Sequence, residues 1–255
     1  MKLLTCLICA SIPALPAAAA DHQNPRFAII DWFPFGWVED GRNVGMLVDM
    51  VKLYNRHLDQ NLEDIVSPVP RVIRGMEEGD FDFTITYRDA GMLGNVDYLG
   101  DIGCLKSLIV SFKTHPVTSL DGLTGLTVGY PGGGYFAKRF APYLDLQRVE
   151  VPQTFVMLNM ALRGRLDALI LNNAVLEAYK RDMFPGFTVP QERWADFAEP
   201  AVIEELPLAA SMSLKSRFGV VAERMRALSS DPAFLADLRE IYASYGVEHA
   251  MECLK

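Results

Sequence analysis

One local sequence pattern occurs twice in this chain and constrains its fold more than any other feature. Gly79-Asp80-Phe81-Asp82 runs into the apolar segment Phe83–Thr86, and Gly164-Arg165-Leu166-Asp167 runs into Ala168–Leu171. Each copy follows apolar residues at helical spacing, namely Val72, Ile73 and Met76 before the first and Phe155, Leu158 and Leu162 before the second. A helix–turn–strand unit that recurs along one chain predicts two similar α/β lobes, and small-molecule sites often lie between lobes.

The segments around the two copies alternate between short apolar strands and helices. The expected strands are residues 26–30, 64–67, 83–86, 126–130, 148–151 and 168–171. The expected helices are residues 47–58, 71–78, 154–163 and 173–180, together with one that begins near residue 135. This βαβαβ order in each half predicts parallel sheets that are covered by helices on both faces.

Two further extended runs, residues 106–112 and 206–213, flank the second half of the chain. They predict two hinge strands, through which the chain enters the second lobe and returns from it. The expected fold class is therefore α/β, with two doubly wound lobes joined by two hinge strands. Residues 21–110 and 212–255 would form a discontinuous lobe 1, which two C-terminal helices complete, and residues 111–211 would form lobe 2.

Residues 1–20 have the pattern of a cleavable signal peptide. Lys2 supplies the positive start, Leu3–Leu15 the apolar stretch, and Ala18-Ala19-Ala20 an A-x-A cleavage site. The apolar stretch is too short to span a membrane, and proline interrupts it. We therefore expect a secreted protein that resides in the periplasm.

The charge balance narrows the classes of partner. The 255 residues carry a formal net charge of −8. An acidic surface argues against nucleic acid or an anionic membrane as partner, because both attract clustered Lys and Arg. The four histidines are scattered, with none at ligand spacing to a cysteine or to another histidine, so we expect no metal site. We also expect no cofactor and a monomeric protein.

Two cysteines, Cys104 and Cys253, remain once the signal peptide is removed. In an oxidising compartment two cysteines favour one disulfide, which here would tie the C-terminal tail to the middle of the chain. The alternative is a free, buried Cys104 and an exposed Cys253.

Loops that follow the C-terminal ends of strands are the usual ligand contacts in doubly wound sheets. The loop after the first expected strand contains Trp32, Phe33, Phe35 and Trp37 around a proline. Such side chains can stack on a ligand, and we take Trp32, Phe35 and Trp37 as candidate contacts. The alternative is that two or three of these rings simply pack under the loop.

The loop after the third expected strand of the first half carries Thr86 and Arg88. A guanidinium in this position is suited to clamp a carboxylate through two parallel hydrogen bonds. The alternative is an ordinary surface salt bridge from Arg88 to Asp89 or Asp97.

The corresponding loops of the second half contain a glycine-rich segment and an asparagine. Gly133, Gly134 and Tyr135 precede an expected helix, so their backbone N–H groups are candidates to receive an anion. The segment is not a phosphate-binding P-loop, because no Gly-Lys-Ser/Thr follows it. Asn172 stands just beyond the second copy of the repeat and is the last candidate contact.

Taken in order, these residues resemble the family 3 extracellular solute-binding proteins of ABC transporters, of the polar amino-acid type. The resemblance covers nearly the whole chain after the signal peptide. Its pieces are Phe33-Pro34-Phe35, Asp40-Gly41…Gly45…Asp49, Pro68…Arg71…Gly79…Asp82, Thr86…Arg88, Leu123-Thr124-Gly125…Val128-Gly129 and Gly164…Asp167-Ala168. It implies a hinged, type II periplasmic-binding fold that closes on a small-molecule solute. It also implies a membrane permease of an ABC transporter as partner, and it adds Arg71 to the candidate ligand contacts.

Two departures from the family's pattern bear on the ligand. The amino-acid binders of the family carry Thr-x-x-Arg, whereas Thr86-Tyr87-Arg88 is one residue shorter. The family's ammonium-binding aspartate falls on Asn172, and a neutral amide cannot form an ion pair with an α-ammonium group. A carboxylate, an aromatic acid or another polar metabolite therefore fits better than a standard L-amino acid.

Three functions compete at this point. The leading hypothesis is a binding protein that delivers a solute to a membrane transporter. The second is a periplasmic hydrolase or dehydratase, which would need an acid or base in the cleft. The loops offer mainly Asp31, Glu39 and Asp89 for that role. Because the sequence contains no Gly-x-Ser-x-Gly motif, metal cluster or Cys/His pair, we do not expect an enzyme. The third is an accessory or sensory subunit that keeps the fold but docks to a protein.

Overall fold

The computed structural model describes residues 22–88, 94, 96–132 and 147–254, so the expected signal peptide lies outside the described residues. Its central feature is an eight-stranded sheet with the strand order β4-β1-β5-β10-β6-β9-β7-β8. The strands are β1 (Arg26–Ile30), β4 (Glu63–Ser67), β5 (Phe83–Tyr87), β6 (Val96–Ser111), β7 (Thr127–Pro131), β8 (Gln147–Val151), β9 (Ala168–Asn172) and β10 (Ala201–Ser213). A separate hairpin consists of β2 (Trp37–Glu39) and β3 (Arg42–Val44).

Helices cover this sheet and close the chain. The α-helices are α1 (Met46–Leu58), α2 (Val69–Glu78), α4 (Thr154–Leu162), α5 (Asn173–Lys180), α6 (Gln191–Trp194), α7 (Gly219–Leu228) and α8 (Pro232–Ser244). Two 3₁₀ helices are η1 (Asp121–Leu123) and η2 (Glu248–Leu254). Within the described ranges, none of the helices combines the length and the hydrophobicity that crossing a membrane requires.

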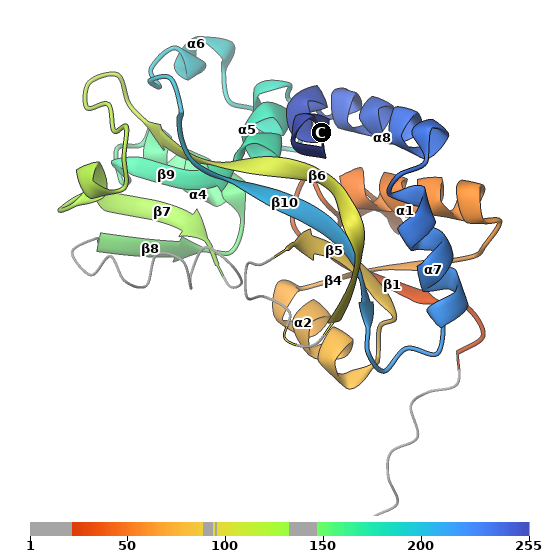
Figure 1. The fold of residues 1–255 in the computed structure, drawn as a ribbon. Helices are drawn as coiled ribbons and strands as arrows, with labels where there is room; N and C mark the ends of the chain where they lie inside the picture. The colour runs from red at the N-terminus through yellow and green to blue at the C-terminus, as the bar shows by residue number, and fades with distance from the viewer. Residues whose placement is uncertain (1–21, 89–93, 95, 133–146, 255) are drawn as a thin grey trace, which may run out of the picture.

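The sheet is built from two parallel triplets with a long antiparallel pair between them. Strands β4, β1 and β5 pair in parallel at one end, and β8, β7 and β9 pair in parallel at the other. Strands β10 and β6 cross the middle, antiparallel to each other and to the triplets that they join. We call the first triplet with α1, α2, α7 and α8 the β1 lobe, and the second with α4 and α5 the β7 lobe (Figure 1). The expected fold class is confirmed.

The crossing strands bring the C-terminal ends of both triplets to one place. The expected hinge runs lie within β6 and β10, where Lys106 is opposite Glu205. Figure 1 shows the two strands side by side across the molecule, with the arrowhead of β5 from one lobe and those of β7 and β8 from the other directed toward the middle. The C-terminal ends of these strands are therefore directed toward the region between the lobes.

The repeated Gly-x-x-Asp turn performs the same structural task in each lobe. The glycine of each copy has a positive φ (85° and 68°), which ends the preceding helix without steric cost. The carboxylate of Asp82 accepts a hydrogen bond from the backbone N–H of Arg26, the first residue of β1, at 2.8 Å. The carboxylate of Asp167 accepts one from the backbone N–H of Thr127, the first residue of β7, also at 2.8 Å. The repeat in the sequence thus fastens the start of one central strand in each lobe.

The C-terminal helices pack on the β1 lobe. Tyr54 of α1 and Phe234 of α8 are buried, and their ring centroids lie 4.8 Å apart. The hydroxyl of Tyr242, also on α8, donates to the backbone oxygen of Ile102 on β6 at 3.1 Å. These buried aromatic contacts join the end of the chain to its first half.

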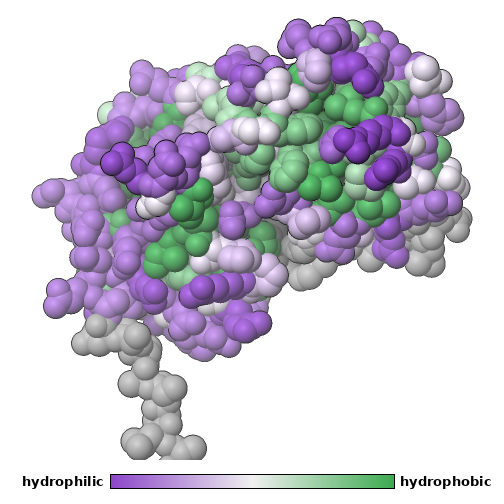
Figure 2. Space-filling model, turned by 180° about the vertical axis from the view of Figure 1, so that it is seen from behind, coloured by the Kyte–Doolittle hydropathy of each residue, from purple (hydrophilic) through white to green (hydrophobic). Residues whose placement is uncertain are grey.

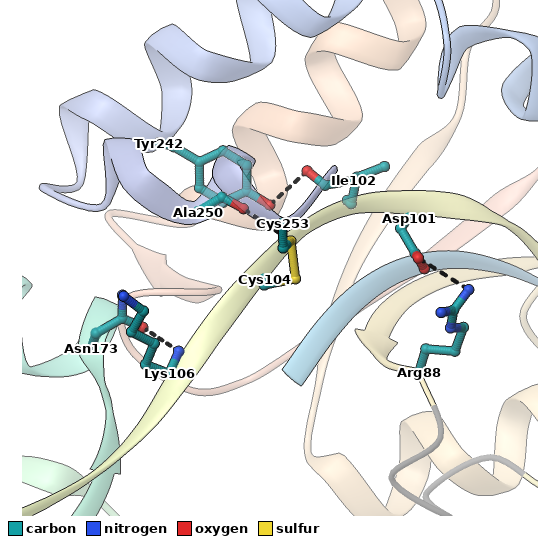
Figure 3. Close-up of a disulfide and its surroundings, with 9 residues drawn as sticks. All are labelled: Arg88, Asp101, Ile102, Cys104, Lys106, Asn173, Tyr242, Ala250 and Cys253. Atoms are coloured by element: carbon teal, nitrogen blue, oxygen red, sulfur yellow. Dashed lines mark hydrogen bonds and ion pairs between the residues drawn. A yellow bond between two sulfur atoms is a disulfide. The ribbon is translucent and has the colours of Figure 1, made fainter. Parts of the chain in front are cut away.

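Strand β6 is fastened on both sides of Leu105 (Figure 3). The structure joins Cys104 of β6 to Cys253 of η2 by a disulfide, so the predicted bridge is confirmed. Two residues further along, the backbone N–H of Lys106 donates to Oδ1 of Asn173 at the start of α5, at 2.9 Å. The strand is therefore attached to the C-terminal segment on one side and to the β7 lobe on the other.

The rear surface of the molecule is mixed in polarity. Figure 2 shows hydrophobic surface over both lobes, separated by polar surface. Among the described residues, the exposed large hydrophobic side chains are Val38, Val202, Leu214 and Val220. Single exposed apolar side chains of this kind are normal on a folded protein and indicate no interface by themselves.

Candidate functional site

A cavity of about 480 Å³ lies where the two lobes meet. This volume falls within the range of small-molecule sites, which is roughly 300–1,000 Å³. The β1 lobe lines it with Asp31, Trp32, Phe33, Trp37, Val38 and Pro68, and the chain of the β7 lobe lines it with Pro152, Gln153, Thr154, Tyr179 and Phe184. The loops after β1, β4 and β8 supply much of this lining, as the rule for doubly wound sheets predicts.

Aromatic rings from both lobes are part of the wall and contact each other directly. The ring of Phe33 lies 4.9 Å from that of Trp37, 5.2 Å from that of Tyr179 and 4.9 Å from that of Phe184, measured between centroids. The contacts with Tyr179 and Phe184 are edge-on, the arrangement that aromatic pairs favour. Phe155, on α4, stacks on Phe184 with the ring centroids 5.5 Å apart. The cavity therefore has a continuous aromatic wall that both lobes build.

Two polar atoms in the lining are shut off from solvent without a hydrogen bond. Nε1 of Trp37 and Oγ1 of Thr154 are buried and have no partner among the residues that the structure describes. The whole Thr154 residue is only 3% exposed. A buried polar group left unsatisfied costs about 1–3 kcal/mol. Because an indole N–H can only donate, any group that satisfies Trp37 has to be an acceptor.

The N-terminus of α4 lies at the same cavity. Thr154 is the first residue of this helix, and Gln153 in the N-cap position forms no side-chain cap. The first N–H groups of a helix lack intrahelical partners and carry a partial positive charge. Nearby, burial raises the pKa of the Tyr179 hydroxyl, and a hydrogen bond with the Phe155 backbone acts in the opposite direction. The first turn of α4 and the Tyr179 phenol therefore lie together at this end of the cavity.

The residues just beyond the two copies of the repeat contact each other. The side-chain nitrogen of Asn172 donates to the hydroxyl of Tyr87 at 3.1 Å, which links the end of β9 to the end of β5. Oδ1 of Asn172 accepts from the backbone N–H of Val175 at 2.9 Å, so Asn172 is the N-cap of α5. Both ends of this buried amide are therefore already engaged within the protein.

Substitution of Asn172 should separate its capping role from any role in ligand binding. We expect Asn172→Ala to lower the free energy of unfolding by about 1–2 kcal/mol, because it removes an N-cap and the bond to Tyr87. Asn172→Asp should lie close to the wild type, since a carboxylate caps a helix equally well and can accept from the tyrosine hydroxyl. Urea denaturation of the three proteins measures this, and equal losses for Ala and Asp would contradict the capping role.

The guanidinium of Arg88 forms an ion pair with a carboxylate on the crossing strand β6 (Figure 3). Its Nη1 lies 3.0 Å from Oδ2 of Asp101 on β6. The alternative considered from the sequence was a surface salt bridge from Arg88 to Asp89 or Asp97. Asp89 lies outside the described residues, and Asp97 pairs with Arg226 at 2.9 Å. Arg88 thus has a carboxylate of its own chain beside it, which a ligand would have to join or displace.

Comparison with known proteins decides the fold. No protein-family model matches the chain, and no curated protein matches it. Among solved structures, the arginine-, lysine-, histidine-binding protein ArtJ from Geobacillus stearothermophilus is similar, with 16% identity, a TM-score of 0.66, and coverage of 88% of this chain and 95% of that chain. A histidine kinase sensor domain with similarity to periplasmic binding proteins has 14% identity, a TM-score of 0.69, and coverage of 88% and 96%. The chain has a type II periplasmic-binding fold.

The same periplasmic-binding fold occurs in receptor domains. The GluR0 ligand-binding core in complex with L-glutamate has 12% identity, a TM-score of 0.69, and coverage of 89% of this chain and 99% of that chain. The matched structures named here are thus a binding protein, a sensor domain and a receptor core. At these identities the likeness establishes the fold, as the resemblance in the sequence implied.

Within the periplasmic-binding fold, the predicted contacts are dispersed. Trp32 and Trp37 line the cavity, as predicted from the aromatic loop. Phe35 is 5% exposed and packs in the hydrophobic core under that loop. Arg71 is exposed on α2 and Thr86 is buried within β5, and neither belongs to the described lining of the cavity. The predicted contacts Gly133, Gly134 and Tyr135 lie outside the described residues.

Most of the lining residues were not among the sequence-based candidate contacts, and Thr154, Tyr179 and Phe184 are three of them. Thr154 carried a usable signal, because it follows an expected strand at residues 148–151, where ligand loops are found. Tyr179 and Phe184 carried none, since the position of α5 against the aromatic loop depends on packing between segments that are far apart in the sequence.

Proposed function

We propose that the protein is a periplasmic solute-binding protein that closes on a small polar, carboxylate-bearing solute and delivers it to an ABC-type transporter. The observation that carries the proposal is the cavity of about 480 Å³ between the lobes, lined by aromatic rings from both. The solved structure of ArtJ, whose name describes an arginine-, lysine- and histidine-binding protein, supports the general class of function. We retain the expectation that the protein is not an enzyme and acts as a monomer.

The proposal includes the division of the chain and its location. We propose residues 21–110 and 212–255 as lobe 1 and residues 111–211 as lobe 2. The crossing of β6 and β10 between the parallel triplets supports two lobes joined by two strands. The signal-peptide pattern of residues 1–20 supports export to the periplasm, where the solute would be passed to a membrane permease.

Native mass spectrometry of the freshly purified protein, followed by a thermal-shift screen of organic acids and amino acids, tests the proposal. A solute present at 100 times its Kd should add about 2.7 kcal/mol to the free energy of unfolding and raise the melting temperature. Catalytic turnover of a bound compound would contradict a pure binding role. Failure of every compound in a broad panel to shift the melting temperature would count against solute binding itself.

A sensory domain is the second candidate, and one observation favours it. Side chains of the protein itself join the two lobes, through the Asn172–Tyr87 hydrogen bond and through Phe33 against Tyr179 and Phe184. A sensor that signals by opening on binding needs such contacts in its resting state. Small-angle scattering distinguishes the two roles: a radius of gyration that increases when a solute binds favours the sensor, and one that decreases favours the transport protein.

A further inference from the structure

We propose that the cavity between the lobes binds a quaternary ammonium group of the solute, held by the aromatic wall and by the carboxylate of Asp31. The inference rests on the proposed function, because it names the cationic group that the same cavity takes. The carboxylate that the proposed function gives the solute belongs to the other end of the molecule. The solute class is therefore a zwitterion with a methylated ammonium group.

The first support is the charge of the lining. Asp31 is the one formally charged residue among the lining residues that the structure describes. Its side chain is exposed, and no cation among the described residues forms an ion pair with it. An unpaired carboxylate at a cavity without a cationic residue attracts a positive group and repels a negative one. The described lining therefore favours the cationic end of a solute over its acid group.

The second support is that polar atoms of the wall are out of contact with the cavity. Nε1 of Trp37 and Oγ1 of Thr154 are shielded from solvent, although both residues line the cavity. The side chains of Trp37 and Thr154 therefore present carbon to a solute. A primary ammonium group carries three N–H donors and needs acceptors for them, whereas a quaternary ammonium group carries none. A wall rich in carbon therefore suits the quaternary group.

The third support is the arrangement of the rings. Those that line the cavity are Trp32, Phe33, Trp37, Tyr179 and Phe184. The plane of Phe33 makes angles of 58°, 66° and 83° with the planes of Trp37, Tyr179 and Phe184, so these rings do not form a flat stack. A cation within about 6 Å of a ring centroid is attracted to the π-face, and cages of aromatic rings bind quaternary ammonium groups in this way. A rounded trimethylammonium group can contact several differently oriented rings at once, whereas a planar group stacks on one.

The residue at position 172 gives the fourth support. Asn172 stands where the amino-acid binders that the sequence resembles have an ammonium-binding aspartate, and its amide is engaged within the protein. The nitrogen donates to Tyr87 and the oxygen accepts from Val175. A quaternary ammonium group needs no hydrogen-bond acceptor, so rings can hold it without an aspartate at this position. Recognition of the positive charge thus moves from the end of β9 to the aromatic wall.

Isothermal titration calorimetry with matched probes tests this assignment. Glycine betaine and choline carry the trimethylammonium group, and 3,3-dimethylbutanoate and 3,3-dimethylbutanol are their isosteres with carbon in place of the ammonium nitrogen. Glycine supplies an ammonium group without methyl groups. We expect each trimethylammonium compound to bind roughly tenfold more tightly than its carbon isostere, and glycine betaine to exceed glycine by a similar factor. Because the members of a pair differ in charge at one atom, the ratio of their dissociation constants measures recognition of the cation.

Variants of the wall should lower that ratio. Phe184→Leu keeps an apolar side chain but removes a π-face, so we expect the ratio to fall by about threefold. Asp31→Asn should lower it by about twofold, because the carboxylate is exposed. The matched controls lie outside the described lining: Phe187→Leu replaces a half-buried ring and Glu39→Gln an exposed carboxylate, and both should leave the ratio unchanged. Because the ratio compares two ligands on one protein, it does not depend on the stability of the variant.

The outcomes distinguish this inference from the proposed function. Equal affinities within each pair of isosteres would overturn the assignment, and so would a ratio that Phe184→Leu and Asp31→Asn leave unchanged. Binding of glycine, or of a compound from the thermal-shift screen, without binding of either trimethylammonium compound would overturn it and leave the solute-binding function standing. Absence of binding by every probe and by every compound of the screen would count against both.

Discussion

Replacement of Asp82 by alanine should destabilise the protein by about 3 kcal/mol, whereas the same change at Asp167 should cost only about 1 kcal/mol. The two aspartates hold the same place in the repeated turn, but their surroundings differ. Asp82 is 2% exposed, and it contacts the backbone N–H of Arg26 at 2.8 Å, the hydroxyl of Ser216 at 2.7 Å and Nε2 of His22 at 2.6 Å. Asp167 is exposed and accepts one backbone hydrogen bond, also at 2.8 Å.

The difference follows from what each alanine leaves behind. Without the Asp82 carboxylate, three partly buried groups lose their common hydrogen-bond partner, and each such bond contributes a net of about 0.5–1.5 kcal/mol. Water can replace the carboxylate at the exposed position of Asp167. Urea denaturation with unchanged m-values provides the comparison, and the pair of variants controls for the loss of one negative charge. Equal destabilisation at the two sites would show that burial does not distinguish the two copies.

Loss of the Cys104–Cys253 bond should lower the free energy of unfolding by about 2–5 kcal/mol. The two cysteines are separated by 149 residues, so the bond closes a long loop and removes many conformations from the unfolded chain. It also holds η2 on β6, next to the buried Tyr242 of α8. The stability of the β1 lobe therefore depends on a contact between distant parts of the chain.

The double variant Cys104→Ser/Cys253→Ser is the appropriate form of this test, because it leaves no unpaired thiol. Its melting temperature and urea midpoint should fall by the same amount as those of the wild type in a reducing agent. The mass of the oxidised wild type, measured with and without a thiol-alkylating reagent, shows whether the bond is present at the start. A double variant as stable as the oxidised wild type would show that the bond contributes nothing to folding.

Much of the architecture was predictable because it rests on local patterns. Alternating strands and helices are encoded by hydrophobic periodicity within each segment. The Gly-x-x-Asp repeat predicted two lobes since each copy contains both the residue that ends a helix and the one that fastens a strand. The disulfide followed from the compartment and the cysteine count alone.

The site was less predictable because it depends on which segments meet. Arg88 follows a strand as a ligand clamp would, yet its partner Asp101 is brought beside it only by the pairing of β5, β10 and β6. Asn172 looked like a neutral substitute for a ligand-binding aspartate, but an N-cap is an equally good use of that side chain. A tertiary ion pair cannot be seen in the local sequence. A helix cap is also hard to assign from sequence, because the predicted start of a helix is uncertain by a residue or two.

The attachments on either side of Leu105 restrict where the molecule can bend. Cys104 is bonded to the C-terminal segment, and Lys106 is bonded to Asn173 of the β7 lobe. We therefore expect rotation of one lobe against the other to be absorbed by the backbone dihedral angles around Leu105 and around Leu206, its partner on β10. A pivot confined to so few residues allows rotation about one axis while resisting translation, so the two walls of the cavity would meet again in the same alignment each time the lobes close.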